Sequence, residues 1–219
     1  MDGSAAEMQA YYASRAPYYD AVYLKPERAK EIAFLSDYLP AAFAGCSVLE
    51  VACGTGYWTQ HIARTAARLV AIDAGPEPLG FAKLRPGAER VTFRLEDAYK
   101  LPADLGEFDA AFAGLWFSHV PIERRIEFIR SLHARLRPRA KVIFIDNSEV
   151  QCREWPIVET DVHGNTYQRR QLRDGSVHRV LKNFPSEGQL MPLISSASAV
   201  SFRQLDNFWL LEYELADAP

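Results

Sequence analysis

The chain has 219 residues, of which 48% are hydrophobic and 24% charged, and its net charge is −3. This composition predicts a globular protein with a sizeable core, and the acidic balance argues against nucleic acid as a partner. The three cysteines are odd in number and lack metal-ligand spacing, so we expect free thiols and no bound metal. No stretch approaches the roughly 18 apolar residues of a membrane span, and the first residues lack a signal-peptide pattern. We therefore expect a cytoplasmic protein with no membrane partner.

The N-terminal region, about residues 7 to 23, is rich in tyrosine and is interrupted by Pro17, which predicts two short helical pieces. Its tyrosines, Tyr12 among them, either pack a terminal helix onto the protein or form a lid over a ligand. Arg15 in the same segment is placed to reach a carboxylate. A helix is expected next, from Pro26 to Leu39, with Pro40 ending it.

A strand, a glycine turn and a helix follow. Residues 46–51 form a short apolar run typical of a buried strand, and a helix is expected over about 57–67. Gly54 and Gly56 permit positive φ and a close approach of ligand to backbone. Glu50 lies within the strand, where an ionised carboxylate is costly unless a positive or hydrogen-bonding group meets it. The pattern therefore favours a cationic ligand over a phosphate.

Strands and helices then alternate. Strands are predicted over 68–73, 90–95, 108–115 and 141–147, and helices over 76–84 and 122–136, the last stopped by Pro138. This order predicts a doubly wound, Rossmann-like α/β fold with a mostly parallel sheet and helices on both faces. Ligands bind at the carboxyl ends of such strands. The polar residues expected to converge there are Glu50, Asp73, Asp97, His119 and Asp146.

The C-terminal part changes character. Residues 166–172 and 177–181 flank Asp174-Gly175, a strong hairpin signal, and a short helix over 186–195 begins with Ser186 as its cap. Strands over 200–205 and 208–215 form a final antiparallel pair. We expect a seven-stranded sheet with an antiparallel last strand, plus an inserted β-hairpin. The chain is interpreted as one domain over 1–219: cap helices at 1–40, a cofactor-binding core at 44–147, and the hairpin, helix and final strands at 148–219.

These motifs, in this order, resemble a class I S-adenosylmethionine-dependent methyltransferase of the small-molecule type. Residues 50–56 (EVACGTG) resemble the family's first motif, and Asp73 resembles the acid that ends its second strand. Asp97-Ala98 resembles the pair beside the adenine, and residues 115–120 the segment after strand four. A dinucleotide fingerprint would need a third glycine where Thr59 stands.

The resemblance implies S-adenosylmethionine as cofactor and S-adenosylhomocysteine as product. It implies that Asp73 accepts hydrogen bonds from the ribose, Asp97 from the adenine, and that Glu50 orders the amino-acid end. The predicted cofactor-binding residues are Tyr12, Arg15, Glu50, Ala52, Gly54, Gly56, Trp58, Asp73, Ala74, Asp97, Ala98 and Leu115. The open alternatives are an NAD(P)-dependent oxidoreductase and a non-catalytic methyltransferase-like domain that binds a ligand.

The acceptor is expected to be a small molecule methylated on oxygen or nitrogen. His119 is the candidate general base, because its ordinary pKa suits proton removal, and a structural histidine is the alternative. Asp146-Asn147 resembles part of the metal site of catechol-type enzymes, but the usual partner acid after strand four is absent. The hairpin's charges (Arg169, Arg170, Arg173, His178 and Arg179) form either a solvated face or a grip on an anionic substrate. Anionic and aromatic acceptors, and a monomer or homodimer, remain open.

Overall fold

The computed structural model describes residues 3–217 and contains a seven-stranded sheet in the order β3-β2-β1-β4-β5-β10-β9. The strands are β1 (Ser47–Val51), β2 (Arg68–Asp73), β3 (Val91–Leu95), β4 (Phe108–Gly114), β5 (Leu136–Asn147), β9 (Ser198–Gln204) and β10 (Phe208–Glu214). The first five are parallel, whereas β10 is antiparallel to both neighbours. The predicted Rossmann-like fold with an antiparallel last strand is confirmed.

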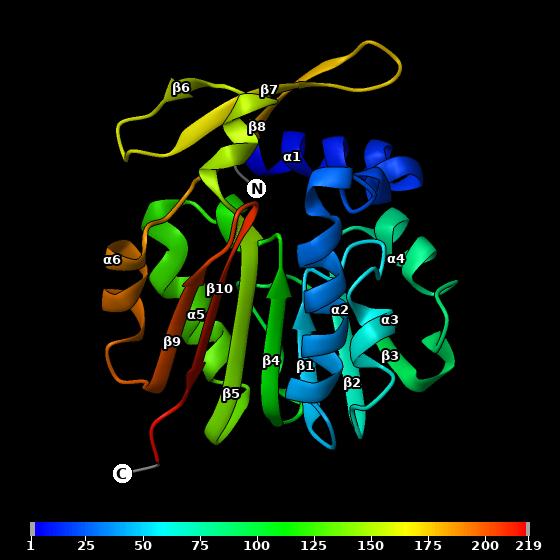
Figure 1. Ribbon diagram of the computed structural model, residues 1–219, viewed down its shortest axis with the longest axis vertical. Coiled ribbons are helices and arrows are strands. Elements are labelled where there is room, and N and C mark those ends of the chain that lie inside the picture. Colours follow the sequence, from blue (N-terminus) through cyan, green and yellow to red (C-terminus); the bar gives the residue numbers. More distant parts are fainter. Residues whose placement is uncertain (1–2, 218–219) are drawn as a thin grey trace.

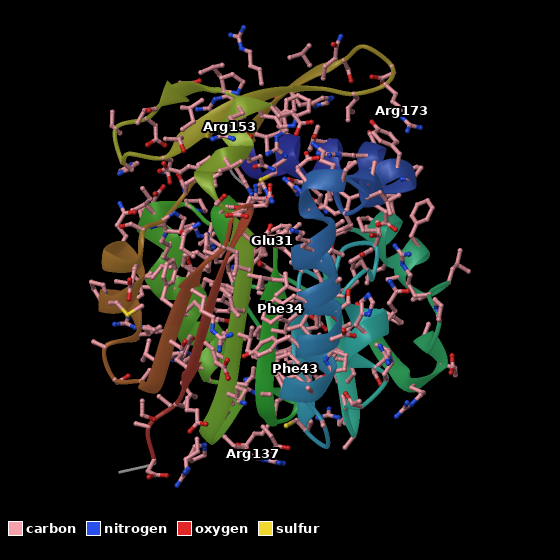
Figure 2. All side chains as sticks on the ribbon, in the orientation of Figure 1. Glu31, Phe34, Phe43, Arg137, Arg153 and Arg173 are labelled. Carbon is pink, nitrogen blue, oxygen red and sulfur yellow. The ribbon has the colours of Figure 1, made fainter. Side chains whose placement is uncertain are left out.

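Helices cover both faces of the sheet (Figure 1). The α-helices are α1 (Gly3–Arg15), α2 (Ala29–Ala42), α3 (Thr59–Ile62), α4 (Pro76–Ala82), α5 (Arg125–His133) and α6 (Glu187–Leu190). The 3₁₀ helices are η1 (Ala16–Val22), η2 (Pro26–Arg28), η3 (Ala88–Arg90), η4 (Ala103–Leu105), η5 (Phe117–His119), η6 (Ile122–Arg124), η7 (Glu149–Arg153) and η8 (Met191–Ile194). Figure 2 shows Glu31, Phe34 and Phe43 spread along α2 and its end. Glu31 accepts hydrogen bonds from Asn207 and so ties α2 to the β9–β10 turn.

Alternate strand residues build a core on each face of the sheet, as the period of two requires. Leu49 and Val51 of β1 join Phe128 of α5 on one face, whereas Val48 joins Leu35 of α2 on the other. All five side chains are buried. Burial on both faces explains why the sequence of β1 is an apolar run. Polar groups are therefore found at the carboxyl end of the strand.

A second sheet crosses the carboxyl ends of the parallel strands, with α1 between part of it and the main sheet (Figure 1). Its antiparallel strands are β6 (Ile157–Thr160), β7 (Thr166–Gln171) and β8 (Val177–Leu181). The predicted hairpin is therefore confirmed as β7–β8, while β6 is an additional strand that the sequence did not indicate. Figure 2 shows Arg173 at the far end of this hairpin, where it is exposed.

Pro138 was expected to stop a helix, but it lies within strand β5. The register between β4 and β5 jumps from Phe108↔Leu136 to Ala110↔Lys141, so residues 137–140 bulge and need no ladder donor at Pro138. Arg139 takes the positive φ of 59° within that bulge. The preceding helix, α5, is consequently shorter than the predicted 122–136, and Ile126 within it is 53% exposed.

Two other predicted helix boundaries were wrong. Helix α2 continues through Pro40 to Ala42, because Pro40 lies in the last turn, where its missing N–H leaves only one carbonyl unpaired. The helix expected over 57–67 is reduced to α3 (Thr59–Ile62) followed by turns. Over residues 3–217, no helix combines the length and apolar character that crossing a membrane requires.

Candidate active site

The turn after β1 is held by the carboxylate at the end of β2. The Gly54 N–H donates to Oδ2 of Asp73 at 2.8 Å, and the Gly75 N–H donates to Oδ1 at 2.8 Å. Gly54 has a φ of 57°, which a glycine adopts without steric cost. Because each carboxylate oxygen has two lone pairs, Asp73 keeps acceptor capacity for a ligand while it orders both turns.

Left-handed backbone also occurs at two non-glycine residues beside the strand ends. Ala52 follows β1 with a φ of 53°, and Leu115 follows β4 with a φ of 57°. Such a conformation costs roughly 1–2 kcal/mol at a residue with a Cβ, and strain of this kind concentrates at functional sites. Both residues line the same cavity, which links the strain to the cavity wall.

Glu50 brings a buried carboxylate to this wall. The side chain is 1% exposed, and its Oε2 has no hydrogen-bond partner among the described residues. Burial, reinforced by the charge of Asp73, raises the pKa of Glu50 to about 8. The indole Nε1 atoms of Trp58 and Trp116 are likewise buried without a partner in the described chain. Buried polar groups are normally satisfied, so three unpartnered ones around one cavity point to a bound ligand.

The cavity that these residues line has a volume of about 630 Å³ and lies at the carboxyl ends of β1, β2 and β4. It is large enough for a ligand of nucleoside size or more. Of the residues predicted to bind the cofactor, ten line it: Tyr12, Glu50, Ala52, Gly54, Trp58, Asp73, Ala74, Asp97, Ala98 and Leu115. Sequence reasoning missed other lining residues, including Gln9, Tyr23 and Tyr99, which carry no local motif.

The other two predicted residues lie elsewhere. Gly56, with a φ of 75°, has its Cα against helix α4: a Cβ there would be 2.9 Å from the Cα of Ala82. The backbone of Gly56 therefore lies close to helix α4, whereas a close approach to a ligand was expected. Arg15 lines a separate, smaller cavity beside the large one. Its guanidinium donates to the hydroxyl of Tyr11 at 2.6 Å and lies over the ring of Tyr19.

His119, at the end of η5, forms part of the wall of both cavities. Its Nδ1 lies 2.6 Å from the Leu181 carbonyl oxygen, and its Nε2 lies 2.8 Å from the hydroxyl of Tyr12. A carbonyl only accepts, so Nδ1 carries the proton and Nε2 accepts from Tyr12. Burial, with the charges of Lys182 and Arg170, lowers the pKa of His119 well below its usual range. The imidazole is therefore neutral at physiological pH.

Asp146, near the end of β5, forms an ion pair with Lys182, the residue that follows β8. Lys182 Nζ lies 3.0 Å from Asp146 Oδ1 and 2.5 Å from Ser118 Oγ, and both charged side chains are at most 1% exposed. Burial lowers the pKa of Lys182 to about 8. Burial also raises the pKa of Asp146, but Lys182 and the Ser118 N–H bring it below its usual value. The Asp146 carboxylate is thus committed to a buried ion pair.

The smaller cavity, of about 30 Å³, is lined by cations from several elements. Arg170, named from the hairpin charges, is among them. Arg28 and Lys182 are also among them, and both were missed, because nothing local in the sequence separates a buried cation from a surface one. Arg169 and Arg179 are outside both cavities, and Arg179 pairs with Glu159 on the hairpin sheet.

Comparisons with known proteins agree with this geometry. Residues 48–139 match the family model described as a methyltransferase domain. The chain is 34% identical over 111 residues to the ubiquinone biosynthesis O-methyltransferase of Xanthomonas oryzae pv. oryzae (strain PXO99A), an alignment that covers 48% of this chain and 46% of that protein. It is 32% identical over 103 residues to an uncharacterized methyltransferase of Synechocystis sp., covering 47% of each. The matched part thus spans about half the length of these curated relatives.

Solved structures match over the whole chain. The fold is similar to that of DhpI in its complex with SAH, with a TM-score of 0.82, 27% identity and 100% coverage of both chains. It is also similar to the DhpI–SAM–HEP complex, with a TM-score of 0.77, 28% identity and coverage of 97% of this chain and 98% of that one. The chain is therefore similar in fold, in its strand-end carboxylates and, over residues 48–139, in sequence to S-adenosylmethionine-dependent methyltransferases.

Proposed function

We propose that this protein transfers a methyl group from S-adenosylmethionine to an oxygen or nitrogen atom of a small molecule. The proposal depends chiefly on one observation: Glu50, Asp73 and Asp97, from the carboxyl ends of adjacent strands, line a single cavity of about 630 Å³. A cofactor without phosphate charge suits these carboxylates better than a dinucleotide pyrophosphate does. The curated relatives named as O-methyltransferases support oxygen as the acceptor atom.

The donor set fits the cofactor. Asp73 retains lone pairs for the ribose hydroxyls, Asp97 can accept from the adenine amino group, and the buried Glu50 suits the cationic amino-acid end. S-adenosylmethionine, when bound, supplies a methyl group attached to a positively charged sulfur, which is already a good leaving group. The chain's task is then to align donor and acceptor and to keep water out.

Aromatic side chains supply that exclusion. Tyr12 and Tyr19 of the N-terminal segment lie over the strand ends and line both cavities, and Trp58 and Trp116 add to the large one. Aromatic faces tolerate a nearby cation through their quadrupole.

The role of His119 is constrained by its hydrogen bonds. Nε2, its one unprotonated nitrogen, already accepts from Tyr12. Proton removal by His119 therefore requires the Tyr12 hydroxyl to move away first. We propose that the Tyr12–His119 pair positions the acceptor between the two cavities.

The direct test is transfer of labelled methyl from S-adenosylmethionine to a panel of phenols, carboxylic acids and amines. Label in at least one product is expected, with turnover lost in Asp73→Ala. If no member is methylated and the protein binds neither S-adenosylmethionine nor S-adenosylhomocysteine, the proposal is wrong. Oxidation of a panel of alcohols with NAD would instead support the oxidoreductase alternative.

A further inference from the structure

The cavity of about 30 Å³ adjoins the large one, since Tyr12, Tyr19, Leu115 and His119 line both. This volume holds about two water-sized groups, by the measure that one such group needs roughly 10–15 Å³. A small polar head group fits it, with the rest of a molecule extending toward the large cavity. The chemistry of its wall decides which head group.

The wall is strongly cationic. Arg15, Lys25, Arg28, Arg170 and Lys182 line it, and Glu154 is its one acidic lining residue within the described chain. Lys25 pairs with Glu154, and Lys182 pairs with Asp146. Arg15, Arg28 and Arg170 form no ion pair with a carboxylate of residues 3–217. The wall therefore holds a surplus of three positive charges.

Arg28 is the clearest of the three. It is 5% exposed, and its guanidinium has one hydrogen-bond acceptor among the described residues, the Val22 carbonyl oxygen at 3.3 Å. Its guanidinium lies over the ring of Phe208, and burial lowers its pKa. Arginine has five N–H donors and is rarely buried without a partner, because desolvating a charge costs several kcal/mol. Most of these donors lack an acceptor within residues 3–217.

Arg170 approaches the cavity from β7 and is 3% exposed. It donates to Oε1 of Gln168 at 2.7 and 3.1 Å, and more weakly to Tyr12 Oη at 3.4 Å and Gln151 Oε1 at 3.5 Å. Every one of these acceptors is neutral. Gln168 thus fixes the plane of the guanidinium without neutralising it, which leaves a pre-oriented cation beside Tyr12 and His119.

We propose that the small cavity is an oxyanion subsite in which Arg28 and Arg170 bind a carboxylate, phosphonate or phosphate group of the methyl acceptor. The inference rests on the proposed methyl transfer and adds the acceptor's chemical class. Guanidinium groups favour planar, bidentate contacts with such anions. Burial strengthens the attraction, since water screens it little. The Arg170–Tyr12–His119 chain would then couple the bound anion to the wall of the cofactor cavity.

The carboxylate at the amino-acid end of the cofactor is also an oxyanion that could bind this subsite. The test must therefore separate an oxyanion of the acceptor from the carboxylate of the cofactor. Calorimetric titrations with acetate and with methylphosphonate are made on protein saturated with S-adenosylhomocysteine, and on protein saturated with 5′-methylthioadenosine, which lacks the amino-acid part. Acetamide serves as the neutral counterpart of acetate. The matched control is Arg169→Gln, because Arg169 adjoins Arg170 in the sequence but points to the exposed face.

The proposal predicts that at least one oxyanion binds both forms of the protein, that acetamide does not, and that Arg170→Gln and Arg28→Gln each weaken binding at least tenfold. Arg169→Gln should leave binding unchanged, and affinity for S-adenosylhomocysteine should change less than threefold in Arg170→Gln. Oxyanion binding only with 5′-methylthioadenosine would assign the site to the cofactor carboxylate and overturn the proposal. Normal S-adenosylhomocysteine binding without any oxyanion binding would overturn it too, and would leave the proposed methyl transfer intact.

Discussion

The hydroxyl of Tyr12 lies 2.8 Å from Nε2 of His119, although 107 positions separate the two residues in the chain. Tyr12 belongs to α1 and His119 follows β4, so the contact closes the N-terminal segment over the strand ends. Since Nδ1 of His119 donates to Leu181, the hydrogen bond from Tyr12 also fixes the tautomer of the imidazole.

Removing that hydroxyl tests the positioning role. Tyr12→Phe keeps the ring but leaves Nε2 of the buried His119 without a donor, which costs about 1–3 kcal/mol. We expect kcat/KM for the acceptor to fall roughly tenfold or more, with a smaller change in the dissociation constant of S-adenosylhomocysteine. Steady-state kinetics and calorimetry measure the two quantities. A faster variant whose turnover gains a new dependence on pH would instead show that Tyr12 masks a general base.

Glu50 should make stability depend on pH. Burial raises its pKa from 4.5 to about 8, so the folded protein keeps the proton that the unfolded chain loses between these values. Stability from this group is therefore fully present below pH 4.5 and is lost as pH rises through about 8. Relative to Glu50→Gln, the free energy of unfolding of the ligand-free protein should fall by on the order of 3 kcal/mol between pH 5 and 8.5. Parallel urea-unfolding profiles for the two proteins would contradict this account.

The two glycines of the first turn should respond differently to alanine. A Cβ at position 54 would have no heavy atom within 4 Å, so Gly54→Ala meets only the strain of its positive φ, roughly 1–2 kcal/mol. Gly56→Ala adds a contact of 2.9 Å with the backbone of Ala82 and should lower stability further, by about 3 kcal/mol or more. Thermal unfolding ranks the variants. Relative to its loss of stability, Gly54→Ala should lose more cofactor affinity than Gly56→Ala does. The reverse ranking would refute the assignment of Gly54 to the cofactor cavity and of Gly56 to the contact with α4.

The buried Lys182–Asp146 pair predicts a pattern of non-additivity. Lys182→Met strands the Asp146 carboxylate and should cost about 3–5 kcal/mol of unfolding free energy. Adding Asp146→Asn removes the stranded charge and should recover part of that loss. Denaturant unfolding of both single variants and the double variant measures the coupling. Additive losses would mean that the two side chains do not stabilise each other.

The proposed cofactor half of the site was largely predictable, because the sequence patterns that indicate it are local. Glu50 and Gly54 are recognisable within one strand and one turn, Asp73 is the last residue of β2, and Asp97 comes two residues after the end of β3. The parallel arrangement of the strands brings these four residues to one edge of the sheet, where all of them line the same cavity.

The proposed acceptor half was not predictable, because its contacts join segments that are distant in the sequence. Lys182 meets Asp146 across 36 positions, and Arg170 meets Tyr12 across 158. The boundary errors have a similar origin: Pro138 lies in a bulge that only the pairing of β4 with β5 defines. In the hairpin, Arg169 is exposed whereas its neighbour Arg170 is buried, and the sequence alone does not distinguish the two arginines.

The central claim is that the cavity of about 630 Å³ at the carboxyl ends of β1, β2 and β4 binds S-adenosylmethionine. Calorimetric titration of the protein with S-adenosylmethionine, and separately with NAD, tests it most directly. We predict one S-adenosylmethionine bound per chain, affinity at least tenfold weaker in Asp73→Ala, and no heat with NAD. Heat with NAD and none with S-adenosylmethionine would contradict the account.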